Sequence, residues 1–207
     1  MSRTSHARRA TPPTARRKDL LTLLHLEHSQ AAYRADFALY GLAVPMLALF
    51  VLIDGPREQW PASLAFTVLG LGAWTLIEYA LHRFVLHGIE PFRGWHAEHH
   101  QRPTALICAP TPLSATLIFL LVFVPSWLLG GLWCACALTL GVLAGYLVYA
   151  ITHHATHHWR ANITWLVQRK RWHALHHHAA QGACCYGVTS GFWDHVFATG
   201  AHRAPTP

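Results

Sequence analysis

Long apolar stretches without Lys or Arg dominate the middle of the chain and alternate with short polar segments. An α-helix needs about 20 apolar residues to cross a bilayer, with a lower limit of about 17. Four stretches reach or approach this length, namely Phe37–Ile53, Ala62–Leu81, Pro112–Leu129 and Leu132–Ile151. The pattern predicts an all-α fold, a four-transmembrane-helix integral membrane protein, and makes a soluble helical protein a poor alternative.

Two short links are expected to join these spans in pairs. Asp54–Pro61 is polar and contains two prolines, which favours a tight connection between the first and second spans. Gly130–Gly131 leaves almost no length for a loop between the third and fourth spans. We therefore expect the last two spans to form a helical hairpin.

The first 36 residues differ from the rest of the chain. Residues 1–18 carry six Lys and Arg residues together with Pro12 and Pro13, which is typical of a disordered basic tail. Asp19–Asp36 mixes leucines with His, Glu and Arg and is expected to form an interfacial amphipathic helix with Asp19 as its N-cap. The chain thus divides into residues 1–36, the tail and interfacial helix, and residues 37–207, the membrane domain.

Charge sets the expected orientation. The chain is 53% hydrophobic and 12% charged, so its net charge of +7 points to a membrane surface and not to nucleic acid. With the N-terminus in the cytoplasm, 15 of the 16 Lys and Arg residues lie on the cytoplasmic side and only Arg57 lies opposite. This asymmetry follows the positive-inside rule and predicts that both termini are cytoplasmic.

Histidines carry the candidate chemistry. Of the 18 in the chain, thirteen fall in four clusters, each at or after the cytoplasmic end of a predicted span. They are His82 and His87; His96, His99 and His100; His153, His154, His157 and His158; and His173, His176, His177 and His178. Residues three and four apart share a face of a helix, so a cluster can aim two or three imidazoles at one point.

These clusters predict a metal centre, because imidazole is the commonest metal ligand. About ten imidazoles exceed one coordination sphere, so we expect two ions. His154 and His178 break the repeat and are expected to be bystanders, and His6, His195 and His202 are not expected to be ligands. Imidazole suits both zinc and iron, so the spacing leaves open hydrolysis by zinc-bound water and O₂ activation by iron.

A non-catalytic membrane metal-binding protein is the alternative from another class. Transporters tend to hold their ligands near the middle of the membrane. Here the clusters lie at the span ends and in cytoplasmic segments, which favours a surface site that takes a lipid substrate.

Two regions of the chain, Glu78–His100 and Tyr146–Thr199, resemble the fatty acid hydroxylase superfamily. EYALHRFVLHG and WHAEHHQRP are similar to the first two histidine boxes of the superfamily. GYLVYAITHHATHHW and RWHALHHH, followed by YGVTSGFWDHVFAT, are similar to its later boxes and C-terminal signature. Within the superfamily the fatty acid 2-hydroxylase branch fits best, and carotenoid or sterol hydroxylases and oxidases are the alternatives.

The resemblance implies a di-iron, O₂-dependent monooxygenase that hydroxylates carbon 2 of a lipid acyl chain. In a purified sample, zinc is an alternative metal at the same site. Asp194 is a candidate to orient a ligand imidazole, with simple helix capping as its alternative role. The implied metal ligands are His82, His87, His96, His99, His100, His153, His157, His158, His173, His176 and His177.

Two departures from the family qualify this expectation. The 2-hydroxylase branch tends to have Asp where this chain has Ala150, just before the third box. Eukaryotic members often carry a fused cytochrome b5 domain, for which 207 residues leave no room, so a separate electron-transfer protein is expected. Residues such as Trp74, Trp127, Gly141, Gly145 and Tyr146 are candidates to line an acyl cleft, although helix packing is their commoner role.

Overall fold

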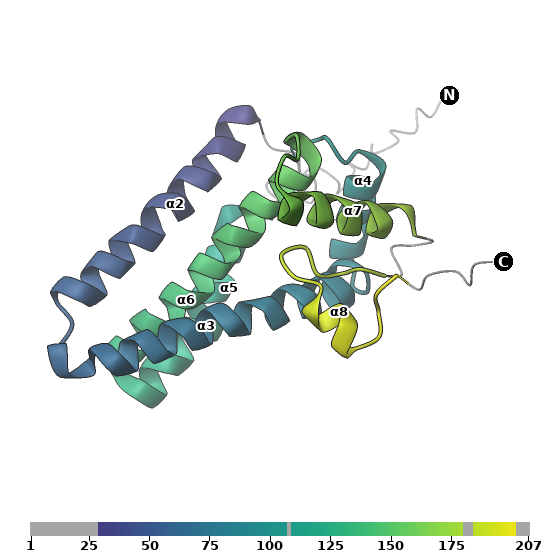
Figure 1. Ribbon diagram of the computed structural model, residues 1–207. Helices are drawn as coiled ribbons and strands as arrows, with labels where there is room; N and C mark the ends of the chain where they lie inside the picture. Colours follow the sequence, from purple (N-terminus) through teal and green to yellow (C-terminus); the bar gives the residue numbers. More distant parts are fainter. Residues whose placement is uncertain (1–28, 107–108, 180–183, 202–207) are drawn as a thin grey trace, which may run out of the picture.

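The computed structural model describes residues 29–106, 109–179 and 184–201, and helices are the only regular elements in that part of the chain (Figure 1). This confirms the predicted all-α class. Three segments are long and apolar enough to cross a membrane, namely Gln30–Ile53, Arg57–Leu86 and Thr111–His158. The described chain is therefore an all-helical protein with three long candidate membrane spans.

The first long helix, α2, covers Gln30–Ile53 and begins where Ser29 Oγ accepts a hydrogen bond from the Ala32 N–H. It runs without interruption through Asp36 and Phe37, where the sequence suggested a boundary between interfacial helix and first span. The rest of the predicted interfacial helix, with the basic tail, lies outside the described residues.

The second long segment combines three kinds of helix. A short 3₁₀ turn, η1 (Arg57–Gln59), leads into α3 (Trp60–Ala80), which continues as a π-helix, η2 (Leu81–Leu86). The polar link before α3 is thus as short as predicted.

The third long segment doubles back on itself. It contains α5 (Thr111–Ile118), the π-helical η3 (Phe119–Phe123) and α6 (Val124–His158). Inside α6, Gly131 has φ +78°, a left-handed backbone conformation that favours glycine. Beyond this break Val142 and Tyr146 pack in one buried cluster with Ile118, so α5 lies beside the second part of α6.

Glycines bring α3 and α6 into direct backbone contact. A Cβ atom on Gly141 would lie 2.1 Å from the Thr67 carbonyl oxygen, and one on Gly70 would lie 2.3 Å from the Leu138 carbonyl oxygen. Small residues allow such close approach between apolar helices. The two helices therefore stay paired up to the end where both run into histidine clusters.

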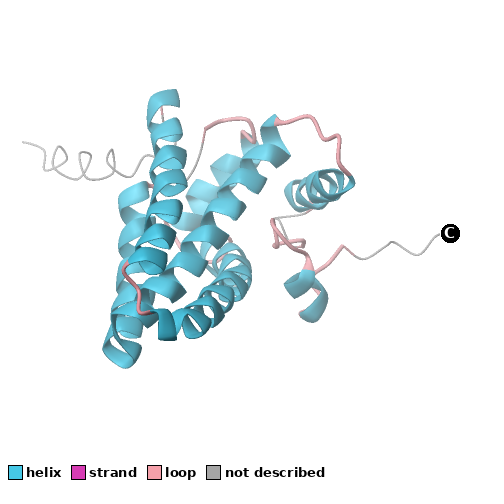
Figure 2. Ribbon diagram, turned by 60° about the vertical axis from the view of Figure 1, so that its left-hand side comes forward, coloured by secondary structure: helices cyan, strands magenta, loops and turns pink. Residues whose placement is uncertain are grey.

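Three shorter helices gather at that end: α4 (Phe92–Gln101), α7 (Thr164–His178) and α8 (Phe192–Val196). Figures 1 and 2 show α7 and α8 beside one end of the long helices. This arrangement surrounds the histidine-bearing helix ends with further histidine-bearing segments.

Candidate metal centre

Nine histidines form two compact groups. The first histidine group consists of His82, His87, His96, His100 and His176, and the second consists of His99, His153, His157 and His173. Within each group every residue offers one ring nitrogen, and these nitrogens lie within 4.8 Å of one another.

The π-helix explains how His82 and His87 come together. Five residues apart, they would not share a face of an α-helix. In η2 the His87 N–H donates to the His82 carbonyl oxygen at 3.2 Å, which is the i→i+5 bond of a π-helix. The two rings consequently lie 5.3 Å apart, centroid to centroid, and both join the first group.

Helices α4 and α7 each serve both groups. In α4, His96 and His100 belong to the first group, whereas His99 belongs to the second. In α7, His176 belongs to the first group and His173 to the second. Histidines three positions apart, His96/His99 and His173/His176, are therefore divided between the two groups, whereas His96 and His100, four apart, stay together.

The ring nitrogens converge through their Nε2 atoms. In the first group Nε2 of His96 lies 2.9 Å from that of His82 and 3.1 Å from that of His100. In the second group the Nε2 atoms of His157 and His173 are 2.8 Å apart. With metal–nitrogen bonds of about 2.0–2.1 Å, two ligands at right angles would have their nitrogens about 2.9 Å apart. The spacing therefore fits imidazoles arranged around shared metal ions.

Burial keeps these imidazoles neutral, the form that binds metal. Desolvation, reinforced by neighbouring histidines, lowers the pKa of His99 to about 2 and that of His100 to about 4. The same causes hold the pKa values of His96 and His173 well below the usual 6.5. The donor set is thus ready to bind metal at neutral pH.

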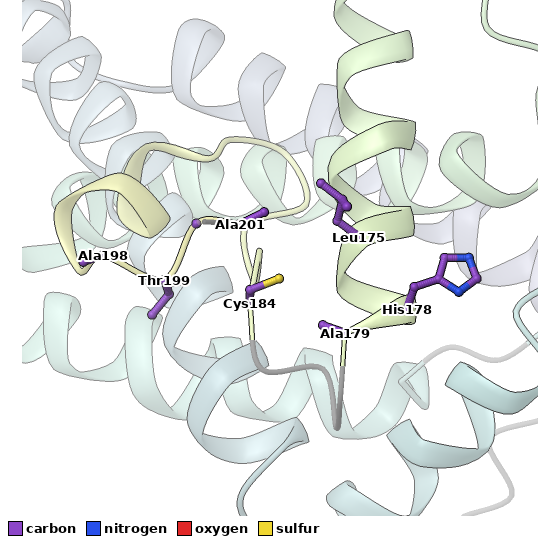
Figure 3. A pocket seen from close by; sticks show the side chains of 8 residues that line it. Leu175, His178, Ala179, Cys184, Ala198, Thr199 and Ala201 are labelled. Atoms are coloured by element: carbon purple, nitrogen blue, oxygen red, sulfur yellow. The ribbon is translucent and has the colours of Figure 1, made fainter. Parts of the chain in front are cut away.

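A C-terminal segment, residues 184–190, contributes backbone carbonyls to the first group, and we call it the strap. The Tyr186 carbonyl accepts a hydrogen bond from His82 Nδ1 at 2.5 Å, and the Cys184 carbonyl accepts one from His176 Nδ1 at 2.7 Å. Because a carbonyl can only accept, both rings carry their proton on Nδ1 and keep Nε2 free as a ligand atom. Figure 3 shows Cys184 near the end of α7, where Leu175 and Ala179 lie.

Two buried carboxylates hold the strap. Glu78 accepts hydrogen bonds from the backbone N–H groups of Val188, at 2.7 Å, and Thr189, at 2.9 Å, and from the Thr189 hydroxyl. Asp194 accepts from the N–H groups of Tyr186, at 2.9 Å, and Gly187, at 2.8 Å. Asp194 thus holds the residue whose carbonyl accepts from His82, and among the described residues none of its hydrogen-bond partners is a ligand ring. Sequence reasoning gave Glu78 no role, although an acid one turn before His82 in an apolar span was a visible signal.

Some predicted site residues lie outside the two groups. His177 is at the edge of the second group, with its Nε2 atom 3.1 Å from that of His173. His158 is exposed and stacks on His154, whose Nδ1 lies 3.1 Å from the Tyr33 hydroxyl. In Figure 3 the ring of His178 points away from the strap. His6 and His202 lie outside the described residues.

An apolar cavity of about 450 Å³ opens beside both groups. His82 and His96 of the first group and His99 and His153 of the second form part of its wall. Much of the remaining lining is apolar and comes from the long helices, including Trp74, Leu117, Ile118, Val122, Val142 and Tyr146. Of the residues suggested for a cleft, Trp74 and Tyr146 line this cavity. Gly145 instead packs against Trp74, Gly141 packs against α3, and Trp127 is exposed.

Long apolar helices, two all-imidazole groups and an apolar cavity beside them define the class of the protein, namely a helical protein with candidate membrane spans and a site able to hold metal. The sequence model of the family described as Fatty acid hydroxylase matches residues 67–199. The chain therefore belongs to the fatty acid hydroxylase family, which confirms the resemblance in its sequence.

Relatives agree with this assignment. The chain is 36% identical over 171 residues to dihydroceramide fatty acyl 2-hydroxylase FAH2 of Arabidopsis thaliana, covering 77% of this chain and 63% of that protein. It is 31% identical over 174 residues to ceramide very long chain fatty acid hydroxylase scs7 of Schizosaccharomyces pombe, covering 75% of this chain and 48% of that protein. This chain thus spans about half to two thirds of these curated relatives.

A solved structure shares the fold. Full-length scs7p, of which only the hydroxylase domain is visible, superposes with a TM-score of 0.70 at 25% identity. The similarity covers 83% of this chain and 67% of that chain.

Proposed function

We propose that this protein is a membrane-bound di-iron monooxygenase that hydroxylates carbon 2 of a lipid acyl chain. The observation that carries the proposal is the position of the two histidine groups at the wall of a large apolar cavity. The activities named for the relatives, acyl 2-hydroxylation among them, support the choice of reaction and substrate.

The histidines would hold the metal ions, and the residues that line the cavity would hold the lipid. The five Nε2 atoms of the first group and the four of the second would hold one iron ion each, with His177 as a further donor to the second. When bound, a pair of iron ions would allow O₂ to be reduced to an oxidant able to attack a C–H bond. His158, also implied as a ligand by the sequence, would have to turn from its stack on His154 to contribute.

The cavity would orient the acyl chain and keep water away from it. Its volume lies within the usual range of about 300–1,000 Å³ for small-molecule sites. Side chains such as Ile118, Val122 and Val142 offer the chain only apolar contacts, so the polar head of the lipid is expected to remain near the histidines. The distance that the cavity extends beyond the histidine groups would then decide which carbon of the acyl chain faces the metal centre.

We further propose four membrane spans, with both termini and the metal centre in the cytoplasm. The break at Gly131 and the packing of Ile118 against Val142 support two antiparallel spans within Thr111–His158. The location of 15 of 16 Lys and Arg residues supports the orientation. Electrons would come from a separate electron-transfer protein, and we expect no nucleic-acid partner.

Lipid mass spectrometry tests the proposal. Cells expressing the intact chain together with a suitable electron donor should accumulate acyl chains hydroxylated at carbon 2. A His173→Ala/His177→Ala variant present at equal abundance should give none. If the intact chain yields oxygenated carotenoids or sterols but no hydroxylated acyl chains, the proposed substrate is wrong.

A further inference from the structure

The two histidine groups use the same ligand atoms but have unequal support from the rest of the protein. Nδ1 atoms of His82 and His176 in the first group donate to strap carbonyls at 2.5 and 2.7 Å. In the second group the Nδ1 atoms of His99 and His173 are buried and have no hydrogen-bond partner among the described residues. Both of these rings are only 3% exposed, so packing alone fixes their orientation.

Such outer hydrogen bonds change how strongly a metal is held. They fix the tautomer and orientation of a ligating imidazole and raise its basicity, and their loss typically costs about 10–100-fold in metal affinity. This difference favours tighter binding at the first group.

The strap itself depends on charge buried between three elements. Glu78 comes from α3 and Asp194 from α8, and they are 4% and 0% exposed. Burial lowers the pKa of Arg169 in α7, and the charges of Glu78 and Asp194 oppose that lowering. Together the two acids bind four consecutive backbone N–H groups, those of residues 186–189. This clamp fixes the position of Tyr186, whose carbonyl supports His82.

We propose that the first histidine group is the tight metal site and the second the exchangeable one, with Glu78 and Asp194 as positioning residues for the tight site alone. The proposal rests on the metal-binding part of the proposed function. It implies that the protein fills in order, the first group before the second, and loses the second ion first when a chelator is present.

Zinc titration of the full chain tests the inference without requiring catalysis. Purified protein in detergent is stripped of metal and titrated with Zn²⁺ in competition with a chromogenic chelator. We expect two ions per chain in two steps whose affinities differ by about 10–100-fold. Binding of two ions with equal affinity would overturn this inference and leave the proposed function standing, whereas failure to bind any ion would overturn both.

The positioning role is tested by Glu78→Gln. An amide has one acceptor oxygen, so when it accepts from the two N–H groups the Thr189 hydroxyl loses its charged acceptor, and the negative charge that faces Arg169 is removed. We expect the tight step to weaken by about 10–100-fold while the loose step stays unchanged, and the retained loose step shows that the chain is folded. Glu98→Gln is the matched control, because Glu98 is an exposed acid on ligand-bearing α4 paired with Arg102. It should change neither step.

A milder variant covers the case in which Glu78→Gln does not fold. Thr189→Val removes one hydrogen bond to Glu78 and should weaken the tight step in the same direction by a smaller factor. If either variant weakens both steps equally, the carboxylate supports the fold in general and the positioning role is wrong.

Discussion

The two histidine groups differ in what surrounds them more than in what they contain. Both consist of buried and half-buried imidazoles, both contribute to the wall of the same cavity, and both draw on α4 and α7. Within the described part of the chain, only rings of the first group donate hydrogen bonds to the strap. The type of ligand therefore defines which metals each group can bind. The backbone carbonyls that hold the ligand rings define how tightly the metal is bound.

The largest effects are expected from removing one ligand of each group. His176→Ala and His173→Ala should each abolish acyl hydroxylation, because the proposed chemistry needs both ions. Elemental analysis should find about one metal ion per chain in each variant where the intact chain holds two. If His176→Ala kept both ions, the assignment of His176 to the first group would be wrong.

A displaced strap should affect the first group alone. A Cβ atom on Gly187 would lie 1.9 Å from the Ser190 carbonyl oxygen, so Gly187→Ala must move the strap and with it the Tyr186 carbonyl. We expect zinc affinity at the tight step to fall by about 10–100-fold. Gly72→Ala is the control, since a Cβ there would meet nothing within 4 Å. Equal weakening of both titration steps by Gly187→Ala would contradict the comparison.

Narrowing the cavity should affect the substrate and neither ion. Ala150 lies in the cavity wall one turn before His153, so Ala150→Phe would occupy space proposed for the acyl chain. We expect the apparent KM for long acyl chains to rise on the order of tenfold and products to shift toward shorter chains, with metal content unchanged. Val148→Phe, on an exposed position of the same helix, should leave the product distribution unchanged. An unaltered product profile in Ala150→Phe would show that the acyl chain does not occupy this cavity.

The smallest effect is expected from His158→Ala. This side chain is exposed and belongs to neither group, so its loss should change stability by no more than about 0.5 kcal/mol. Metal content should remain at two ions per chain and activity should stay within about twofold. Loss of one ion would instead make His158 a ligand, as the sequence resemblance implied.

The sequence was sufficient for the features that depend on local pattern. Apolar length located the long helices, and the glycine pair at 130–131 located the break inside α6. Histidine spacing identified every residue that the structure brings into the two groups. These features were predictable because the length of an apolar stretch, a helix break and the spacing of residues on one helix face each depend on residues close together in the sequence.

Other features had no such signal. The division of α4 and α7 between two groups depends on how those helices cross, which spacing within one helix does not specify. The support of His82 and His176 comes from backbone carbonyls, and a carbonyl is present at every residue whatever its side chain. Glu78 acts on residues 188–189, more than a hundred positions away along the chain.

The π-helix η2 has a consequence for recognising distant members of such families. Templates built on α-helical spacing count histidine pairs three or four positions apart and would reject a pair separated by five. His82 and His87 meet because the π-helical turn accommodates an additional residue. Their spacing in the sequence does not match an α-helical face, yet their rings lie side by side in the structure. A template restricted to α-helical spacing would therefore miss one of the five ligands of the first group.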